Sequence, residues 1–212
     1  MAISLPRLTD LLAPPLCWGC GGDAGGQPLC APCRVHLRRL GPEPVSLAGI
    51  ATWAPLAYEG AARDLVRGLK YRGAVALADP MAAQIAASAP PGFVAGPSTL
   101  VPVPLHPARL RRRGFNQAER LATALARRTR LAVCDCLERH GPATRQVGRD
   151  RAQRLAGPVE IAHRRGYPVP ARVVLVDDVA TTGATLAACA AVLRARGTRI
   201  CVAVAFARTP GR

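Results

Sequence analysis

The stretch VVLVDDVATTGATL, residues 173–186, carries the side chains best suited to bind a small polar ligand. Asp177 and Asp178 follow an apolar run that is typical of a strand buried on both faces. Thr181, Thr182 and Gly183 come next, and an alanine-rich segment typical of a helix follows them. Free N–H groups and the dipole at a helix N-terminus favour a phosphate, while carboxylates accept hydrogen bonds from sugar hydroxyls. The stretch therefore predicts a sugar-phosphate site, and the alternative is a capped turn with solvated acids.

Neither the P-loop pattern G-x-x-x-x-G-K-[ST] nor the dinucleotide pattern G-x-G-x-x-G occurs in the chain, so these two phosphate-binding motifs are excluded. Instead the stretch closely resembles the ribose-5-phosphate signature of type I phosphoribosyltransferases, in which two acids precede T-T-G-x-T. That resemblance implies a catalytic centre at Asp177 and Asp178, which would hold the ribose hydroxyls of phosphoribosyl pyrophosphate (PRPP) with its Mg2+. The loop and helix start that would hold the 5-phosphate comprise Val179, Ala180, Thr181, Thr182, Gly183, Ala184 and Thr185.

A second constellation consists of Cys17, Cys20, Cys30 and Cys33, in a C-x2-C-x9-C-x2-C pattern. Each pair can bind one side of a metal ion, and four thiolates with no open position are typical of structural zinc. An iron–sulfur cluster and a redox pair are the alternatives. Such a knuckle either stabilises the N-terminal segment or docks a partner or nucleic acid.

Basic residues form a third group. Arginine-rich segments suit pyrophosphate or a nucleic-acid backbone, a compact lysine suits a phosphate, and an aromatic ring beside arginines can stack on a base. The alternatives are a solvated helix start for the arginines and chance for the lysine. The residues assigned to pyrophosphate are Lys70, Arg109, Arg111 and Arg113, and those assigned to nucleic acid are Arg111, Arg112, Arg113 and Phe115.

Composition supports an anionic partner only in part. The net charge of +16 favours nucleic acid or phosphorylated molecules. Lys70 is the one lysine against 28 arginines, however, and this bias also fits the coding composition of a genome. The apolar runs are too short for a membrane span, and the first residues lack the pattern of a signal peptide. A cytoplasmic location is the resulting expectation.

The elements that must position these residues alternate along the chain. Apolar runs predict strands at 50–57, 99–103, 172–177 and 199–206, and helical patterns cover 61–71, 76–88, 116–129 and 184–196. This alternation predicts an α/β fold with a parallel sheet flanked by helices. We expect a small zinc-binding segment at 1–40, a linker at 41–49 and a phosphoribosyltransferase-like domain at 50–212.

Three further segments, YEGAARDLVRGLKYRG (58–73), LVPVPLHPARLRRRGFNQAERLA (100–122) and QVGRDRAQRLAG (146–157), together resemble the ComF family of competence-associated, phosphoribosyltransferase-like proteins. A four-cysteine knuckle ahead of the domain is also usual in that family. The resemblance implies a part in DNA uptake during natural transformation, with DNA-processing partners. Two functions stay open: transfer of a phosphoribosyl group, and binding of single-stranded DNA without transfer. A metal-stabilised scaffold with an inactive site is the third.

Overall fold

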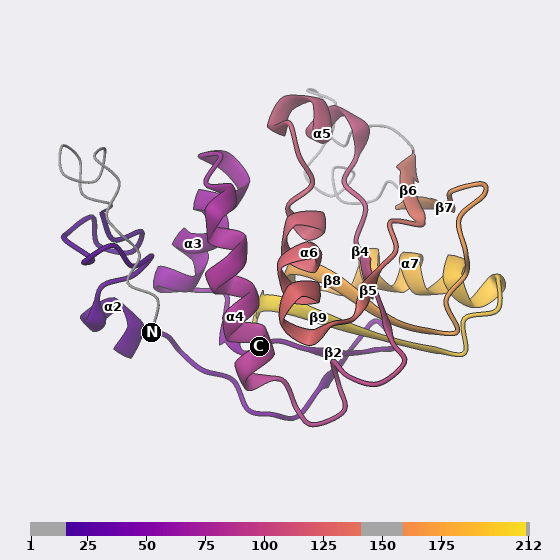
Figure 1. The fold of residues 1–212 in the computed structure, drawn as a ribbon, viewed down its shortest axis with the longest axis horizontal. Helices are drawn as coiled ribbons and strands as arrows, with labels where there is room; N and C mark the ends of the chain where they lie inside the picture. The colour runs from indigo at the N-terminus through magenta and orange to yellow at the C-terminus, as the bar shows by residue number, and fades with distance from the viewer. Residues whose placement is uncertain (1–15, 141–158, 211–212) are drawn as a thin grey trace, which may run out of the picture.

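A computed structural model describes residues 16–140 and 159–210, and its centre is a seven-stranded, mostly parallel sheet (Figure 1). The strands are ordered β1-β2-β9-β8-β4-β5, with β3 pairing on β9. Only β1 runs antiparallel to its neighbour. Their bounds are β1 (Val45–Leu47), β2 (Ile50–Trp53), β3 (Leu56–Ala57), β4 (Thr99–Pro102), β5 (Ala132–Val133), β8 (Arg172–Ala180) and β9 (Ile200–Arg208).

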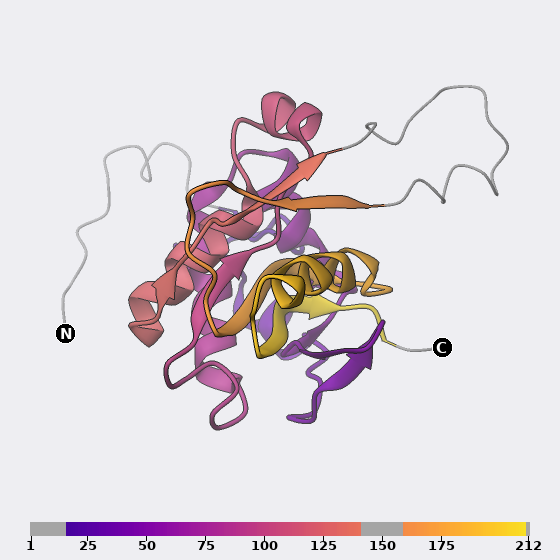
Figure 2. The ribbon, with the colours of Figure 1, turned by 90° about the vertical axis from the view of Figure 1, so that its right-hand side faces the viewer.

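Helices cover both faces of the sheet, which explains why its central strand is continuously apolar. Residues 173–176 of β8 are fully buried. Val174 and Val176 belong to a core shared with α3 (Gly60–Tyr71), α4 (Ala78–Ser88) and α6 (Gln117–Thr129). Val173 and Leu175 belong to a second core under α7 (Ala184–Ala195), the helix nearest the viewer in Figure 2. Successive β8 side chains thus alternate between the two cores.

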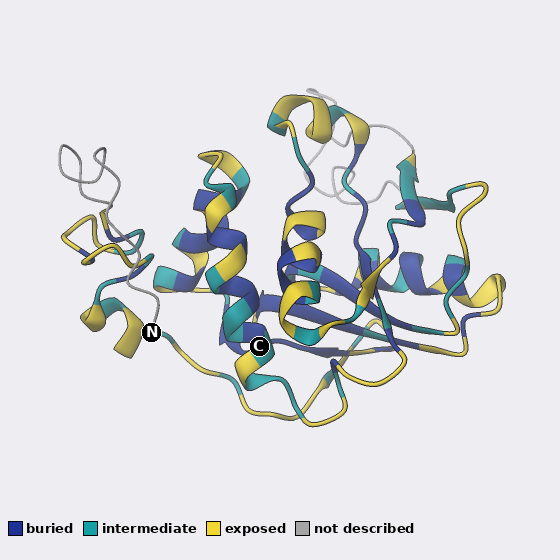
Figure 3. Ribbon diagram, viewed as in Figure 1, coloured by how far each residue is buried: buried dark blue, intermediate teal, exposed yellow. Residues whose placement is uncertain are grey.

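Smaller elements surround this framework. The cysteine-rich segment holds α2 (Ala31–Val35), and η1 (Val75–Leu77) joins α3 to α4. Beyond the carboxyl end of β4 lies α5 (Pro107–Arg113), at the top of Figure 1. An antiparallel pair, β6 (Leu137–His140) and β7 (Glu160–His163), packs on the α7 side. Figure 3 shows the buried positions gathered along the strands and on the inner helix faces, with α5 largely exposed.

The sequence-based fold class is confirmed, because the sheet is mainly parallel and flanked by helices. All four predicted helices occur, within two residues of their predicted starts and one of their predicted ends. The prediction of a plain linker at 41–49 was wrong, since β1 forms there as a three-residue edge strand. The predicted strand ending at residue 177 extends to Ala180, which places the acidic pair inside β8. The segment 146–157 lies outside the described residues.

Within the two described ranges, no helix is both long enough and apolar enough to cross a membrane.

Candidate functional site

Asp178 is the buried acid of the pair, and it forms an ion pair with Lys70. Its side chain is 2% exposed, and one carboxylate oxygen lies 2.9 Å from Lys70 Nζ. Lys70 comes from the last turn of α3, on the sheet face whose core includes Val176. Burial lowers the pKa of Lys70, but Asp178 outweighs this effect, and the pKa stands above its ordinary value. The amine therefore remains a cation beside the carboxylate.

Asp177 lies in a different environment. Strand alternation directs it toward the α7 side, where its carboxylate is half-buried and accepts a hydrogen bond from the Asp178 backbone N–H at 2.8 Å. Burial raises the pKa of Asp177 well above its usual range, and the negative charge of Asp178 raises it further. The two neighbouring acids thus differ, because Asp178 has a dedicated cation, whereas burial and the charge of Asp178 disfavour the ionised form of Asp177.

Gly183 shapes the turn between β8 and α7. Its φ of 81° lies in the left-handed region, and an added Cβ would fall 2.7 Å from the backbone of Leu47 in β1. No other residue fits this position without moving the chain. Thr181 and Thr182 are exposed beside it, and Thr182 Oγ1 accepts a hydrogen bond of 3.4 Å from Ala184 N–H at the start of α7. The turn therefore presents two hydroxyls and a helix N-terminus at the carboxyl end of β8.

The predicted arginines lie on α5 or at its end, and they divide by burial. Arg113 is half-buried, hydrogen-bonds Gln117 Oε1, and stands 5.5 Å from the ring centroid of Tyr71. Burial lowers the pKa of Arg113, although nearby Asp178 opposes that effect. Arg109, Arg111 and Arg112 are exposed. Among these four arginines, Arg113 is therefore the one that is half-buried and whose charge interacts with that of Asp178 on the α3 side.

Phe115, predicted to stack on a base, is partly buried and packs against the core beneath α3, α4 and α6. The next residue, Asn116, caps α6 through its Oδ1 and donates from Nδ2 to the Val103 carbonyl oxygen. These contacts tie the segment after α5 to the end of β4. A packing role for Phe115 is thereby visible, and its binding to bases stays a prediction.

Arg139 is a cation that the sequence analysis missed. It lies in β6, and its charge interacts with those of Arg109 and Asp177 and with the thiol of Cys189 in α7. Burial lowers the pKa of Arg139, and the charge of Arg109 lowers it further. Nothing in the segment around residue 139 resembled a strand or a binding motif, so only the fold could bring it to Asp177. Cations thus flank the acids on both faces of the sheet.

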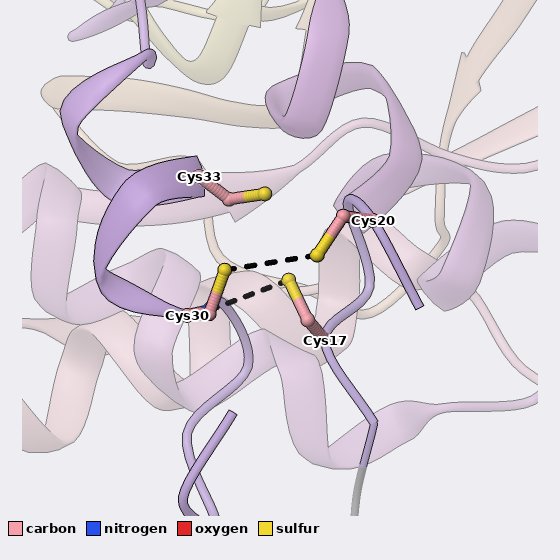
Figure 4. Close-up of side chains that lie close together, drawn as sticks. All are labelled: Cys17, Cys20, Cys30 and Cys33. Atoms are coloured by element: carbon pink, nitrogen blue, oxygen red, sulfur yellow. Dashed lines mark hydrogen bonds between the residues drawn. The ribbon is translucent and has the colours of Figure 1, made fainter. Parts of the chain in front are cut away.

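The four predicted cysteines converge, as Figure 4 shows. Their sulfurs all lie within 4.8 Å of one another, and Sγ of Cys20 and Cys30 are 3.7 Å apart. Four thiolates at about 2.3 Å around one tetrahedral ion would stand about 3.8 Å apart, so the cluster fits a metal. Cys30 backbone N–H donates to Cys17 Sγ at 3.3 Å. Burial raises the pKa of Cys17, but backbone hydrogen bonds outweigh it and bring the value to about 6.

We predict that Gly183→Ala destabilises the protein more than Gly166→Ala does. Both glycines have a positive φ, of 81° and 85°, but nothing lies within 4 Å of a Cβ at Gly166. The control should lose about 1–2 kcal/mol for the left-handed backbone alone. Gly183→Ala should lose about 1–3 kcal/mol more, because β1 must shift. Denaturant unfolding measures both, and equal losses would contradict the close contact with Leu47.

We also predict opposite effects for the two acids. Asp178→Asn leaves Lys70 without its carboxylate and should cost about 3 kcal/mol at neutral pH. Asp177→Asn should stabilise the protein there, because it removes the ionisation of a carboxyl whose folded-state pKa is raised. The folded state binds that proton more tightly than the unfolded chain, so wild-type stability falls as the pH rises above about 4. The gain from Asp177→Asn should therefore shrink toward pH 4 in thermal unfolding. A gain that is independent of pH would contradict this account.

The chain is similar in sequence to three proteins that are named as competence proteins. The chain is 34% identical to the competence protein ComFC of Streptococcus pneumoniae over 41% of this chain and 37% of that protein. It is 36% identical to the competence protein F of Haemophilus influenzae over 48% of this chain and 46% of the relative. A third similarity, to ComFC of Bacillus subtilis, is 25% over 81% of this chain and 68% of the relative. The matches thus span less than half the length of the first two relatives. No protein-family model matches the chain. Together with the clustered cysteines and the α/β sheet, these similarities to competence proteins support a relationship to the ComF family.

Proposed function

We propose that the chain binds a ribose 5-phosphate group, in PRPP or a related ligand, and that it acts in DNA uptake during natural transformation. The role in DNA uptake is inferred from the competence relatives, whose names state competence. The binding site is inferred from the edge where β8 ends. The observation that carries it is the glycine turn at the N-terminus of α7, directly after the half-buried Asp177 and the ion-paired Asp178.

Each part of this edge suits one part of the ligand. The N-terminus of α7 with Thr181 and Thr182 can donate hydrogen bonds to a 5-phosphate. Asp177 and Asp178 can accept hydrogen bonds from ribose hydroxyls. Lys70 forms an ion pair with Asp178, and its ammonium carries three donors that can reach a pyrophosphate oxygen. Arg109, Arg111 and Arg113 extend the positive charge on the same side.

Mg2+ is part of this proposal because it accompanies pyrophosphate. It binds oxygen ligands, and the half-buried Asp177 carboxylate is such a ligand at this edge. When bound, the ion would neutralise pyrophosphate charge. The contribution of the chain itself is to hold the sugar and orient the leaving group, which needs no protein nucleophile.

For the cysteine cluster we propose zinc in a structural role. Thiolates are soft ligands, and the four sulfurs leave no open position for chemistry. The division into a metal-binding segment (1–40) and a ligand-binding domain (50–212) is part of the same proposal. The described part of the segment nevertheless shares a core with the domain, since Cys17, Ala24 and Leu29 pack with residues of α3 and α4.

We predict that PRPP with Mg2+ binds the wild-type chain and binds Asp177→Asn at least about tenfold more weakly, because a charged hydrogen-bond acceptor is lost. Asp79→Asn is the matched control, since Asp79 is exposed on α4 and pairs with Arg127 and Arg128. Titration calorimetry measures the affinities. Unchanged affinity in Asp177→Ala/Asp178→Ala would overturn the site. A separate assay, which measures whether pyrophosphate is released from PRPP when acceptors are added, distinguishes phosphoribosyl transfer from binding alone.

Single-stranded DNA is the second candidate ligand, favoured by the exposed Arg109, Arg111 and Arg112 on and beside the same edge. The backbone contacts of such arginines make affinity depend on salt. We predict that Arg111→Ala/Arg112→Ala lowers the slope of log affinity against log salt by about 1.4, which corresponds to two single-strand phosphate contacts. Arg127→Ala/Arg128→Ala on α6 is the control, and fluorescence anisotropy of a labelled oligonucleotide is the measurement. An equal fall in both variants would remove α5 from the interface.

A further inference from the structure

Trp18 joins the cysteine cluster to α3. It lies between Cys17 and Cys20 in sequence, and its ring rests on the backbone of Gly68. A Cβ at Gly68 would stand 2.6 Å from ring atoms Cε3 and Cζ3 of Trp18. Gly68 is thus the glycine that gives the ring access to the helix. A second contact lies two turns earlier, where a Cβ on Gly19 would stand 3.1 Å from Ala61.

The backbone under Trp18 is the last turn of α3, which carries Lys70. The Gly68 carbonyl oxygen accepts hydrogen bonds from the N–H groups of Arg72 at 3.1 Å and Ala74 at 3.4 Å, and these bonds close the helix. The Arg72 guanidinium stands 5.7 Å from the Trp18 ring centroid. Lys70, two residues after Gly68, lies within this turn and reaches Asp178. Trp18 therefore contacts the helix turn whose position sets where the Lys70 amine lies.

The position of Trp18 depends in turn on the cysteines. Residues 16–30 contain no helix and only the isolated bridge between Leu16 and Asp23, and α2 that follows has five residues. So short a segment needs a cross-link or metal to hold its shape. Trp18 also borders an open groove of about 670 Å³, which includes Asp64, Arg67 and Arg72. Room therefore exists for the ring to leave Gly68 when the cysteines are not held together.

We propose that Trp18 is a positioning residue through which a metal bound by the four cysteines holds Lys70 against Asp178. Metal binding and anion binding at the sheet edge are then coupled, and each favours the other. This inference rests on the proposed metal and on Lys70 as an anion ligand. It goes beyond them, because it assigns the knuckle a part in ligand affinity.

The chain offers a direct probe, because Lys70 is its one lysine. An amine-acylating reagent therefore reports on Lys70, and peptide mass spectrometry separates it from the N-terminal amine. Zinc-loaded wild type should react slowly, since the Lys70 side chain is 19% exposed and paired. Removal of zinc by a chelator should accelerate acylation at least about fivefold, the lower end of typical coupling between sites. Addition of zinc should restore the slow rate.

Substitutions at Trp18 test whether the effect of the metal on Lys70 depends on this ring. Trp18→Ala should acylate quickly with or without zinc, while Trp18→Phe, which keeps an aromatic ring on Gly68, should restore most of the zinc dependence. Val35→Ala is the control within the knuckle, because Val35 is 81% exposed on α2, and it should behave as wild type. Labelling of Cys189, which is fully buried on the inner face of α7, reports global unfolding in the same samples.

Pyrophosphate is the probe for coupling. Its affinity should fall at least about fivefold on removal of zinc from wild type and stay unchanged on removal from Trp18→Ala. A Lys70 acylation rate that ignores zinc in wild type would overturn the inference, as would acceleration that appears only together with Cys189 labelling. If Lys70 responds to zinc but the chain binds neither pyrophosphate nor PRPP, the proposed function fails and the positioning role stands.

Discussion

The ion pair between Lys70 and Asp178 is the constraint on which the rest of the structure depends. Both charges are largely removed from water, and such a pair recovers its desolvation cost only when its geometry is held closely. The last turn of α3 must therefore meet the end of β8. The packing of α3 on the sheet meets this requirement, and the cysteine-rich segment packs against the same helix, with Trp18 at Gly68.

Around that pair, the parallel sheet gathers residues that are far apart in the chain. Carboxyl ends of parallel strands share one edge, which is where open α/β sheets bind ligands. The edge receives Asp177 and Asp178 from β8, Arg113 from the helix after β4, and Arg139 from β6. The raised pKa of Asp177 is a cost to the fold at this edge, and residues of that kind concentrate at functional sites.

Sequence reasoning located the features that depend on local pattern. The long elements, the cysteine cluster and the glycine turn each have a periodicity or spacing that a short window contains. It gave α5 only as the alternative of a solvated helix start, because a single leucine among four arginines has no apolar period, and it missed β6 and β7, which are four residues each. The pairing of Lys70 with Asp178 joins positions 108 residues apart, so only the packing of α3 against β8 brings them together.

The buried ion pair between Lys70 and Asp178 also bears on the function of this edge. Replacing such a pair by well-packed apolar residues is often neutral or stabilising, so stability alone does not account for it. A chain that otherwise uses arginine places its one lysine here, where a compact ammonium can serve Asp178 and a further anion together. The +16 charge of the whole chain is a weaker argument, because exposed arginines also fit a compositional bias. The local arrangement, in which Asp178 pairs with Lys70 and the charges of Arg139 and Arg113 act on Asp177 and Asp178, favours a ligand that carries both hydroxyl and phosphate groups.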